Sequence, residues 1–150
     1  MTIGIANDHR GVTLKQKLTN YLEKKGYNVI NFGTDTTESV DYPDYALKLC
    51  EALNNNEIDT GIAICGTGIG MSIACNKVKG IRCAKVSNEK EAFLARNHND
   101  ANVIAISADT SVMEAKDILD SFLSTNFSLE ERHIRRIEKI KNYEEVSNER

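Results

Sequence analysis

The chain has 150 residues, of which 41% are hydrophobic and 27% are charged, and its formal net charge is −3. This length and balance are typical of a single domain, here residues 1–150, and the acidic excess excludes a general nucleic-acid surface. No apolar run approaches the roughly 18 residues that span a bilayer. The start of the chain also lacks a charged segment followed by an apolar one. We therefore expect a cytoplasmic protein that binds neither nucleic acid nor membrane.

Short β-branched runs alternate along the chain with longer stretches of helical periodicity. This alternation is typical of βα units built on a parallel sheet, so the predicted fold class is α/β with five parallel strands. Gly26 and Gly80 stand where helices would end before two of the strands. The predicted strands are Thr2–Ala6, Tyr27–Phe32, Thr60–Cys65, Ile81–Val86 and Asn102–Ser107.

Apolar residues at helical spacing follow the strands and indicate helices that pack on the sheet. Pro43 suits the first turn of the second helix, because proline lacks an N–H that the first turn does not need. Two capping boxes predict the starts of the last helices. Ser111 is followed three residues on by Glu114, and Ser128 by Glu131.

The last predicted helix, from about Leu129 to Tyr143, has a narrow apolar stripe of three residues, which are Ile134, Ile137 and Ile140. A helix with so little apolar surface is expected to lie across a partner subunit rather than fully on its own sheet. From Glu144 onward the sequence is polar. We expect residues 144–150 to form a frayed tail.

The four cysteines form no CxxC pair, so reduced thiols are predicted. A zinc site would have to be assembled from scattered residues, and we expect no metal. Cys50, Cys75 and Cys83 lie in apolar segments and are interpreted as packing residues. Cys65 differs from them, because a glycine-rich segment follows it directly.

That segment, Gly66-Thr67-Gly68-Ile69-Gly70, fits none of the common nucleotide or phosphatase patterns. Met71 stands where a dinucleotide fingerprint needs a small residue and where a cysteine-phosphatase loop needs arginine, and no GK[ST] follows for a P-loop. What remains is a thiol at a strand end beside backbone N–H groups that can bind an anion at a helix N-terminus. Such a site suits removal of a proton beside a carbonyl, with Cys65 as the base.

Further polar residues are expected near this loop, because ligands bind at the carboxyl ends of parallel strands. Asp8 and His98 suggest an acid/base pair, although each alone could be a turn or helix-end residue. Arg132 and Arg136 are four residues apart and share one helix face. Together they could grip a phosphate, or they could form a solvated surface.

Six motifs follow one another over roughly residues 3 to 142, and they are Asp8-His9, Asp41-Tyr42-Pro43, Cys65-Gly66-Thr67-Gly68-Ile69-Gly70, Ala74-Cys75-Asn76-Lys77, His98-Asn99-Asp100-Ala101-Asn102 and Arg132-His133. In this order they resemble the type B ribose-5-phosphate isomerases and their sugar-phosphate isomerase relatives. The resemblance implies a Rossmann-like α/β/α sandwich and a homodimer, or a dimer of dimers, with composite sites. It also implies interconversion of ribose 5-phosphate and ribulose 5-phosphate in the non-oxidative pentose phosphate pathway, without metal or cofactor.

By position, the resemblance implies four catalytic residues, which are Cys65, His98, Asp8 and Thr67. Asp8 and His98 would open the furanose ring, and Cys65 would move a proton between C2 and C1 of the sugar. The resemblance implies ten substrate-binding positions, which are His9, Tyr42, Gly66, Gly68, Ile69, Gly70, Asn99, Asp109, Arg132 and Arg136. The loop amides, Thr67 and Asn99 would hold the cis-enediolate. His9 and the two arginines would hold the phosphate, and Tyr42 would shape the sugar pocket.

Asp109 departs from the family pattern, in which many members carry a phosphate-binding arginine just after the fifth strand. A carboxylate there would repel a phosphate dianion, so Asp109 points away, pairs with an arginine such as Arg10 or Arg135, or signals another substrate. Two alternatives therefore stay open. One is an isomerase of a six-carbon aldose phosphate, such as allose 6-phosphate or galactose 6-phosphate, and the other is a module that binds a sugar phosphate without catalysis. Retention of the cysteine, histidine and first aspartate in one chain favours the pentose enzyme.

Overall fold

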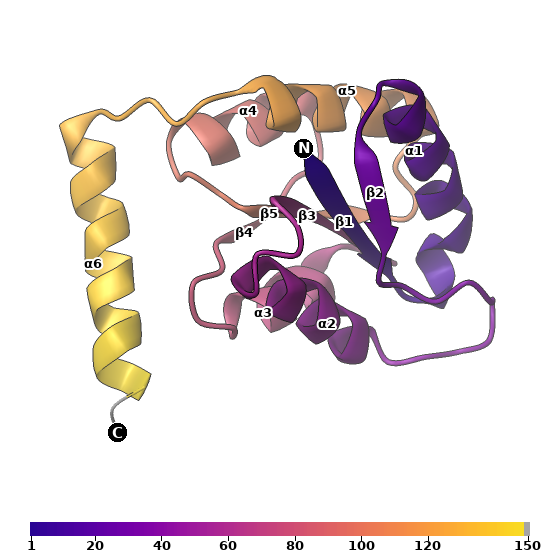
Figure 1. Cartoon of the computed structure of the whole chain (residues 1–150), viewed down its shortest axis with the longest axis horizontal. Coiled ribbons are helices and arrows are strands. Elements are labelled where there is room, and N and C mark those ends of the chain that lie inside the picture. Colours follow the sequence, from indigo (N-terminus) through magenta and orange to yellow (C-terminus); the bar gives the residue numbers. More distant parts are fainter. Residues whose placement is uncertain (149–150) are drawn as a thin grey trace.

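The structure, a computed structural model, describes residues 1–148 and is built on a five-stranded parallel sheet (Figure 1). The strand order is β2-β1-β3-β5-β4. The strands are β1 Thr2–Asn7, β2 Asn28–Asn31, β3 Thr60–Cys65, β4 Cys83–Lys85 and β5 Val103–Ser107. All five predicted strands are confirmed. The three central strands are almost wholly buried because helices cover both faces, which explains their unbroken apolar sequences.

Two layers of helices enclose the sheet, so the expected α/β/α sandwich is confirmed (Figure 1). One face is covered by α1 Val12–Lys24, α4 Glu89–Asn97 and α5 Val112–Ser124. The opposite face is covered by α2 Tyr42–Asn54 and α3 Ile69–Asn76. A short 3-10 turn, His9–Gly11, leads from β1 into α1.

The predicted helix starts are confirmed at α2 and α5 and wrong at the last helix. Pro43 lies in the first turn of α2, and the Ser111 hydroxyl accepts the N–H of Glu114 at 3.2 Å. The last helix, α6 Glu131–Asn148, begins two residues later than expected. Leu129 adopts a left-handed backbone with φ 61°, so Ser128 accepts the N–H of Glu130 instead of closing a capping box.

Helix α6 stands apart from both layers, beyond the edge strand β4 (Figure 1). It is tied to the loop before β4, where the N–H of Gly80 donates to the Glu144 carboxylate at 3.0 Å. Residues 144–148, expected to be frayed, continue the helix, and residues 149–150 lie outside the described part. Within residues 1–148, none of the helices combines the length and apolar character that crossing a bilayer requires.

Candidate active site

The carboxyl ends of β1, β3 and β5 lie side by side at one edge of the sheet. Cys65 at the end of β3 pairs in register with Ser107 at the end of β5, and Asn7 of β1 pairs with Ile64. After β1 the chain crosses to β2 on one side of the sheet, and after β3 it crosses to β4 on the other side. Open α/β sheets bind ligands at the point where the direction of crossing reverses. The segments after Asn7 and after Cys65 both open onto this point.

Cys65 is buried, with 4% of its surface exposed, and its sulfur accepts the N–H of Gly68 at 3.2 Å. Gly68 has a left-handed φ of 79°, and a Cβ there would lie 2.9 Å from the carbonyl carbon of Ile106. Glycine is therefore required for the loop to turn this closely under β5. The loop is also tied to the chain after β5, because Ala108 donates its N–H to the Cys65 carbonyl at 2.8 Å.

The glycine loop continues into α3, whose first turn contains Ile69 and Gly70. Thr67 is exposed, and its hydroxyl accepts the N–H of Ile69 at 3.1 Å, so this amide already has a partner. The ring of Tyr42 lies directly over Gly70, where a Cβ would be 2.5 Å from the Cζ of Tyr42. Tyr42 is 38% exposed and covers this turn of the loop.

Asp8 and His9 follow β1 at the same edge. The buried Asp8 carboxylate accepts the N–H of Arg10 at 2.9 Å, which caps the 3-10 turn. The Nδ1 of His9 accepts the N–H of Val40 at 3.2 Å, so Nε2 is the nitrogen that carries hydrogen in the neutral ring. Both side chains are thus oriented by backbone amides.

Lys15 secures the loop that contains Val40, and sequence reasoning missed it. Its side chain is 6% exposed, and Nζ donates to the Thr34 carbonyl and to the Asp35 carboxylate, both at 2.6 Å. The hydrogen bond from Lys15 lowers the pKa of Asp35. The signal available in the sequence was a lysine directly beside the apolar stripe of α1.

Asp109 pairs with Arg10 rather than pointing away or meeting Arg135. The Arg10 Nη2 lies 3.9 Å from the Asp109 Oδ1, and both side chains are more than half exposed, at 57% and 79%. The Arg10 guanidinium also overhangs the loop, with Nη1 3.7 Å from the position that a Cβ on Gly66 would take. The pair therefore places one exposed positive and one exposed negative charge at the mouth of the site.

His98 lies at the opposite edge of the sheet, so the predicted Asp8 and His98 pair does not form within one chain. His98 precedes β5, whose first residue Val103 pairs with Gly61 near the start of β3. The four steps from Gly61 to Cys65 cover about 13 Å at the usual rise per residue. Residues before a parallel strand lie at its amino end, whereas the thiol lies at the carboxyl end.

Arg132 and Arg136, which were predicted to bind substrate, lie on α6 near His98. The rings of His98 and His133 stack with centroids 4.3 Å apart and planes 17° apart. Burial, together with the nearby His98 and Arg132, lowers the pKa of His133, and within residues 1–148 its Nε2 has no hydrogen-bond partner. Arg132 pairs with Glu130, and Arg136 and Asn99 are exposed.

The remaining cysteines behave as packing residues. Cys50 and Cys75 are fully buried between α2 and α3, and the Cys50 thiol contacts the Cys75 carbonyl at 4.0 Å. A hydrogen bond with Cys75, together with burial, raises the pKa of Cys50 well above the ordinary range. Cys83 is half-buried at the start of β4. Among residues 1–148, no group of three His, Cys, Asp or Glu side chains is arranged to hold a metal ion.

Fold and site together define a doubly wound parallel α/β protein with a buried thiol and a glycine loop at its topological switch point. The sequence profile of the Ribose/Galactose Isomerase family matches residues 3–140. A probable ribose-5-phosphate isomerase B of Mycoplasma genitalium is 44% identical over 145 residues, which are 95% of each chain. The chain belongs to the ribose/galactose isomerase family.

Solved structures agree with this assignment. Ribose-5-phosphate isomerase B of Clostridium thermocellum superposes with a TM-score of 0.95 at 47% identity, covering 98% of this chain and 99% of that one. The enzyme of Mycoplasma genitalium with bound ribulose-5-phosphate superposes with a TM-score of 0.90 at 44% identity, covering 96% of each chain.

Proposed function

We propose that this protein is an aldose–ketose isomerase that interconverts ribose 5-phosphate and ribulose 5-phosphate through a cis-enediolate. The observation that carries the proposal is the buried Cys65 thiol, 3.2 Å from the N–H of Gly68 at the switch point of the sheet. The ribulose-5-phosphate bound to the Mycoplasma genitalium relative, at 44% identity, supports the choice of a pentose phosphate.

In the proposed reaction, the Cys65 thiolate removes the proton from C2 of the open-chain aldose. The electron pair of that C–H bond forms the C1–C2 double bond, and the carbonyl electrons move onto O1 to give the enediolate. A proton then passes from O2 to O1. The O2 electrons form the C2 carbonyl as C1 takes the proton back from the Cys65 thiol, which gives the ketose and regenerates the thiolate. Free N–H groups of the loop stabilise the developing negative charge, as an oxyanion hole does.

The proposal includes a homodimer whose two sites are each built from both copies. His98 and Asn99 lie at the amino edge of their own sheet, about 13 Å or more from Cys65 by strand length. Arg132 and Arg136 lie on α6 near His133, which stacks on His98. A second copy can present these residues to the carboxyl edge. Helix α6 supports this arrangement, because it stands apart from its own sheet with Ile134, Ile140 and Tyr143 exposed at 39%, 56% and 75%.

Within such a site, the roles divide by position. His98 would protonate the ring oxygen while Asp8 takes the anomeric hydroxyl proton, which opens the furanose. His9, Arg132 and Arg136 would bind the phosphate, and a phosphate dianion suits donors that carry charge. Asn99 would add a side-chain amide to the loop N–H groups around the enediolate. The mouth of the site also carries Arg10, whose guanidinium overhangs Gly66.

The proposed function is tested by measuring kcat and KM on ribose 5-phosphate, allose 6-phosphate and galactose 6-phosphate for the wild type and Cys65→Ala. We expect the highest kcat/KM for ribose 5-phosphate. Removing the base should lower kcat by about 100- to 10,000-fold. The KM should change little, because a base acts in the transition state.

Cys83→Ala is the matched control, since Cys83 is a half-buried thiol at the start of β4. It should leave kcat unchanged. A higher kcat/KM for a six-carbon substrate would replace the pentose assignment. Binding of all three sugars without turnover would indicate a binding module, and full activity of Cys65→Ala would remove Cys65 as the base.

A further inference from the structure

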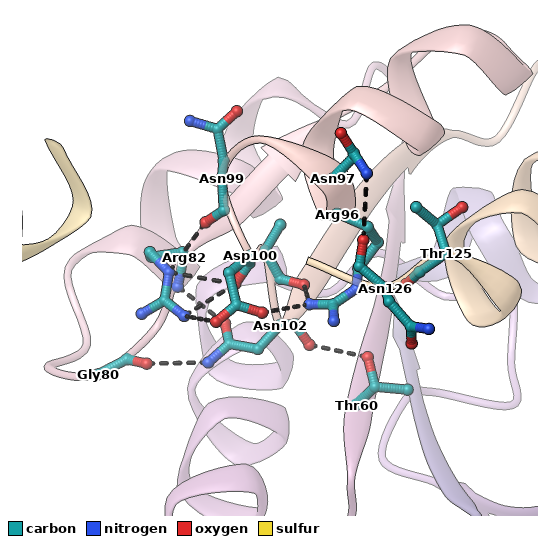
Figure 2. Close-up of polar contacts among 11 residues, drawn as sticks. Thr60, Gly80, Arg82, Arg96, Asn97, Asn99, Asp100, Asn102, Thr125 and Asn126 are labelled. Carbon is teal, nitrogen blue, oxygen red and sulfur yellow. Dashed lines mark hydrogen bonds and ion pairs between the residues drawn. The ribbon is translucent and has the colours of Figure 1, made fainter. Parts of the chain in front are cut away.

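The turn between α4 and β5 is held by two arginines that share one carboxylate (Figure 2). Asp100 lies three residues after the end of α4 in a left-handed conformation with φ 47°, and its N–H donates to the Arg96 carbonyl at 3.1 Å. Glycine is the usual residue at such a helix end. Aspartate adopts this conformation more readily than most residues, and here its side chain is used for a further contact.

The Asp100 carboxylate binds both guanidinium groups. Its Oδ1 lies 2.8 Å from the Arg96 Nη1, and its Oδ2 lies 3.3 Å from the Arg82 Nη2. The Arg82 and Arg96 side chains are only 19% and 22% exposed, and that of Asp100 is 37% exposed. Charge-assisted hydrogen bonds shielded from water in this way are stronger than those of a solvated ion pair.

The same guanidinium groups also bind three consecutive backbone carbonyls. Arg82 donates from Nε to the Asn99 carbonyl at 3.1 Å and from Nη2 to the Asp100 carbonyl at 2.8 Å. Arg96 donates from Nη1 to the Ala101 carbonyl at 2.7 Å. Several donors in one planar fork make these contacts together, which a lysine ammonium cannot reproduce. We call Arg82, Asp100 and Arg96 the arginine clamp.

The arginine clamp determines the course of the backbone next to two residues of the proposed site. Asn99 contributes only its carbonyl to the clamp, and its side-chain amide points away from Arg82 (Figure 2). His98 directly precedes it and stacks on His133 instead. The backbone is thus bound while both side chains remain available to a substrate.

We propose that Asp100 is a positioning residue of the isomerase reaction. Through Arg82 and Arg96 it sets the place from which His98 reaches the ring oxygen of the sugar. The inference rests on the proposed function, in which His98 opens the furanose ring. Removing the carboxylate would loosen the turn, and small displacements of a proton donor reduce the rate strongly.

The test compares two substrates that differ in the need for ring opening. Ribose 5-phosphate closes to a furanose through O4, whereas an aldotetrose 4-phosphate cannot, because its O4 is esterified. Both still need proton transfer by Cys65. For Asp100→Asn, which suits the left-handed backbone, we expect kcat on ribose 5-phosphate to fall by about 10- to 100-fold. On the aldotetrose phosphate the loss should be at least about threefold smaller, because ring opening is not needed and only the Asn99 contact with the enediolate is disturbed.

Arg82→Lys keeps the charge but not the fork, and it should give the same pattern. Arg135→Lys, on the exposed surface of α6, is the matched control and should change neither rate. Thermal unfolding is measured on every variant. Equal losses on both substrates, or losses that follow the fraction of unfolded protein, would show that the arginine clamp is only structural.

A readout without turnover separates this inference from the proposed function. The chain has three histidines, so the ring signals of His98 can be assigned by NMR. In Asp100→Asn the His98 ring signals should shift while those of His9 stay in place. If the wild type turns over neither substrate, the proposed function fails. The His98 ring signals alone then test whether Asp100 holds His98 in place. An unshifted His98 ring would then overturn the positioning role.

Discussion

Single hydrogen bonds distinguish Cys65 from Cys50. The Cys65 sulfur accepts a backbone N–H from Gly68. Cys50 has a thiol partner and full burial, and both raise its pKa, so it remains a thiol. Both side chains are buried, so burial does not distinguish Cys65 from Cys50. The role of the sulfur does, because Cys65 accepts a hydrogen bond from a backbone N–H and the Cys50 thiol donates one to the Cys75 carbonyl.

The ion pair at the mouth of the site is expected to reduce substrate affinity. Asp109 lies 3.9 Å from Arg10, and neutralising it in Asp109→Asn should free the guanidinium for the phosphate. Exposed pairs contribute up to about 1 kcal/mol, so KM for ribose 5-phosphate should fall by about two- to fivefold with kcat unchanged. The effect should shrink in high salt.

A double-mutant cycle identifies the cause of the change in KM. In an Arg10→Ala background, Asp109→Asn should no longer lower KM, since no guanidinium is released. An equal decrease in both backgrounds would mean that Asp109 repels the substrate directly. Asp117→Asn, an exposed carboxylate on α5, is the control for the loss of one negative charge.

At the scale of elements, the three central strands were well predicted because their sequences are governed by burial. The partly exposed edge strands β2 and β4 are shorter than the predicted Tyr27–Phe32 and Ile81–Val86. Unbroken apolar runs are required where helices cover both faces, and all five predicted runs form strands. The start of α6 was mispredicted for a different reason. A capping box needs its serine in an extended conformation just before the helix, and the left-handed Leu129 intervenes. Nothing in the sequence pattern marks a leucine for that conformation.

The glycine loop offers a matched pair of substitutions. Gly68→Ala would place a Cβ 2.9 Å from the Ile106 backbone in a left-handed conformation, whereas a Cβ at Gly66 meets only Arg10 at 3.7 Å. We expect Gly68→Ala to lower the free energy of unfolding by about 1–3 kcal/mol. Gly66→Ala should change it by about 0.5 kcal/mol or less. Urea unfolding of the two variants measures this difference, and equal losses would contradict the strain argument.

At the scale of the whole molecule, the two groups of candidate site residues occupy opposite edges of one sheet. Cys65, Asp8 and His9 follow the carboxyl ends of strands, and His98 precedes the amino end of β5. A dimer with composite sites can therefore be tested by mixing two inactive variants. Cys65→Ala and His98→Asn, unfolded and refolded together, should recover roughly a quarter of the wild-type activity.

This fraction follows from random pairing, in which half of the dimers are mixed and each mixed dimer has one intact site. The control is the same refolding of each variant alone, which should remain inactive. Failure of the mixture to regain activity while mixed dimers form would show that each site belongs to one chain. A monomer at micromolar concentration in sedimentation experiments would also contradict the dimer.

The sequence by itself determined the layers and the place of the glycine loop. Periodicity identified the strands, and the glycines after Cys65 predicted a turn into a helix, because both signals are local and depend on neighbouring residues. It also predicted that α6 would leave its own sheet, from the narrow stripe around Ile137. These features are encoded in short segments, so they can be recognised before the chain is folded.

Only the tertiary structure decided which residues meet. The partner of Asp109, the buried Lys15 behind His9, and the arginine clamp all join residues distant in sequence. The separation of His98 from Cys65 has the same origin. The physical reason is the parallel register of β3 and β5, which places a residue before a strand and a residue at the end of a strand at opposite edges of the sheet.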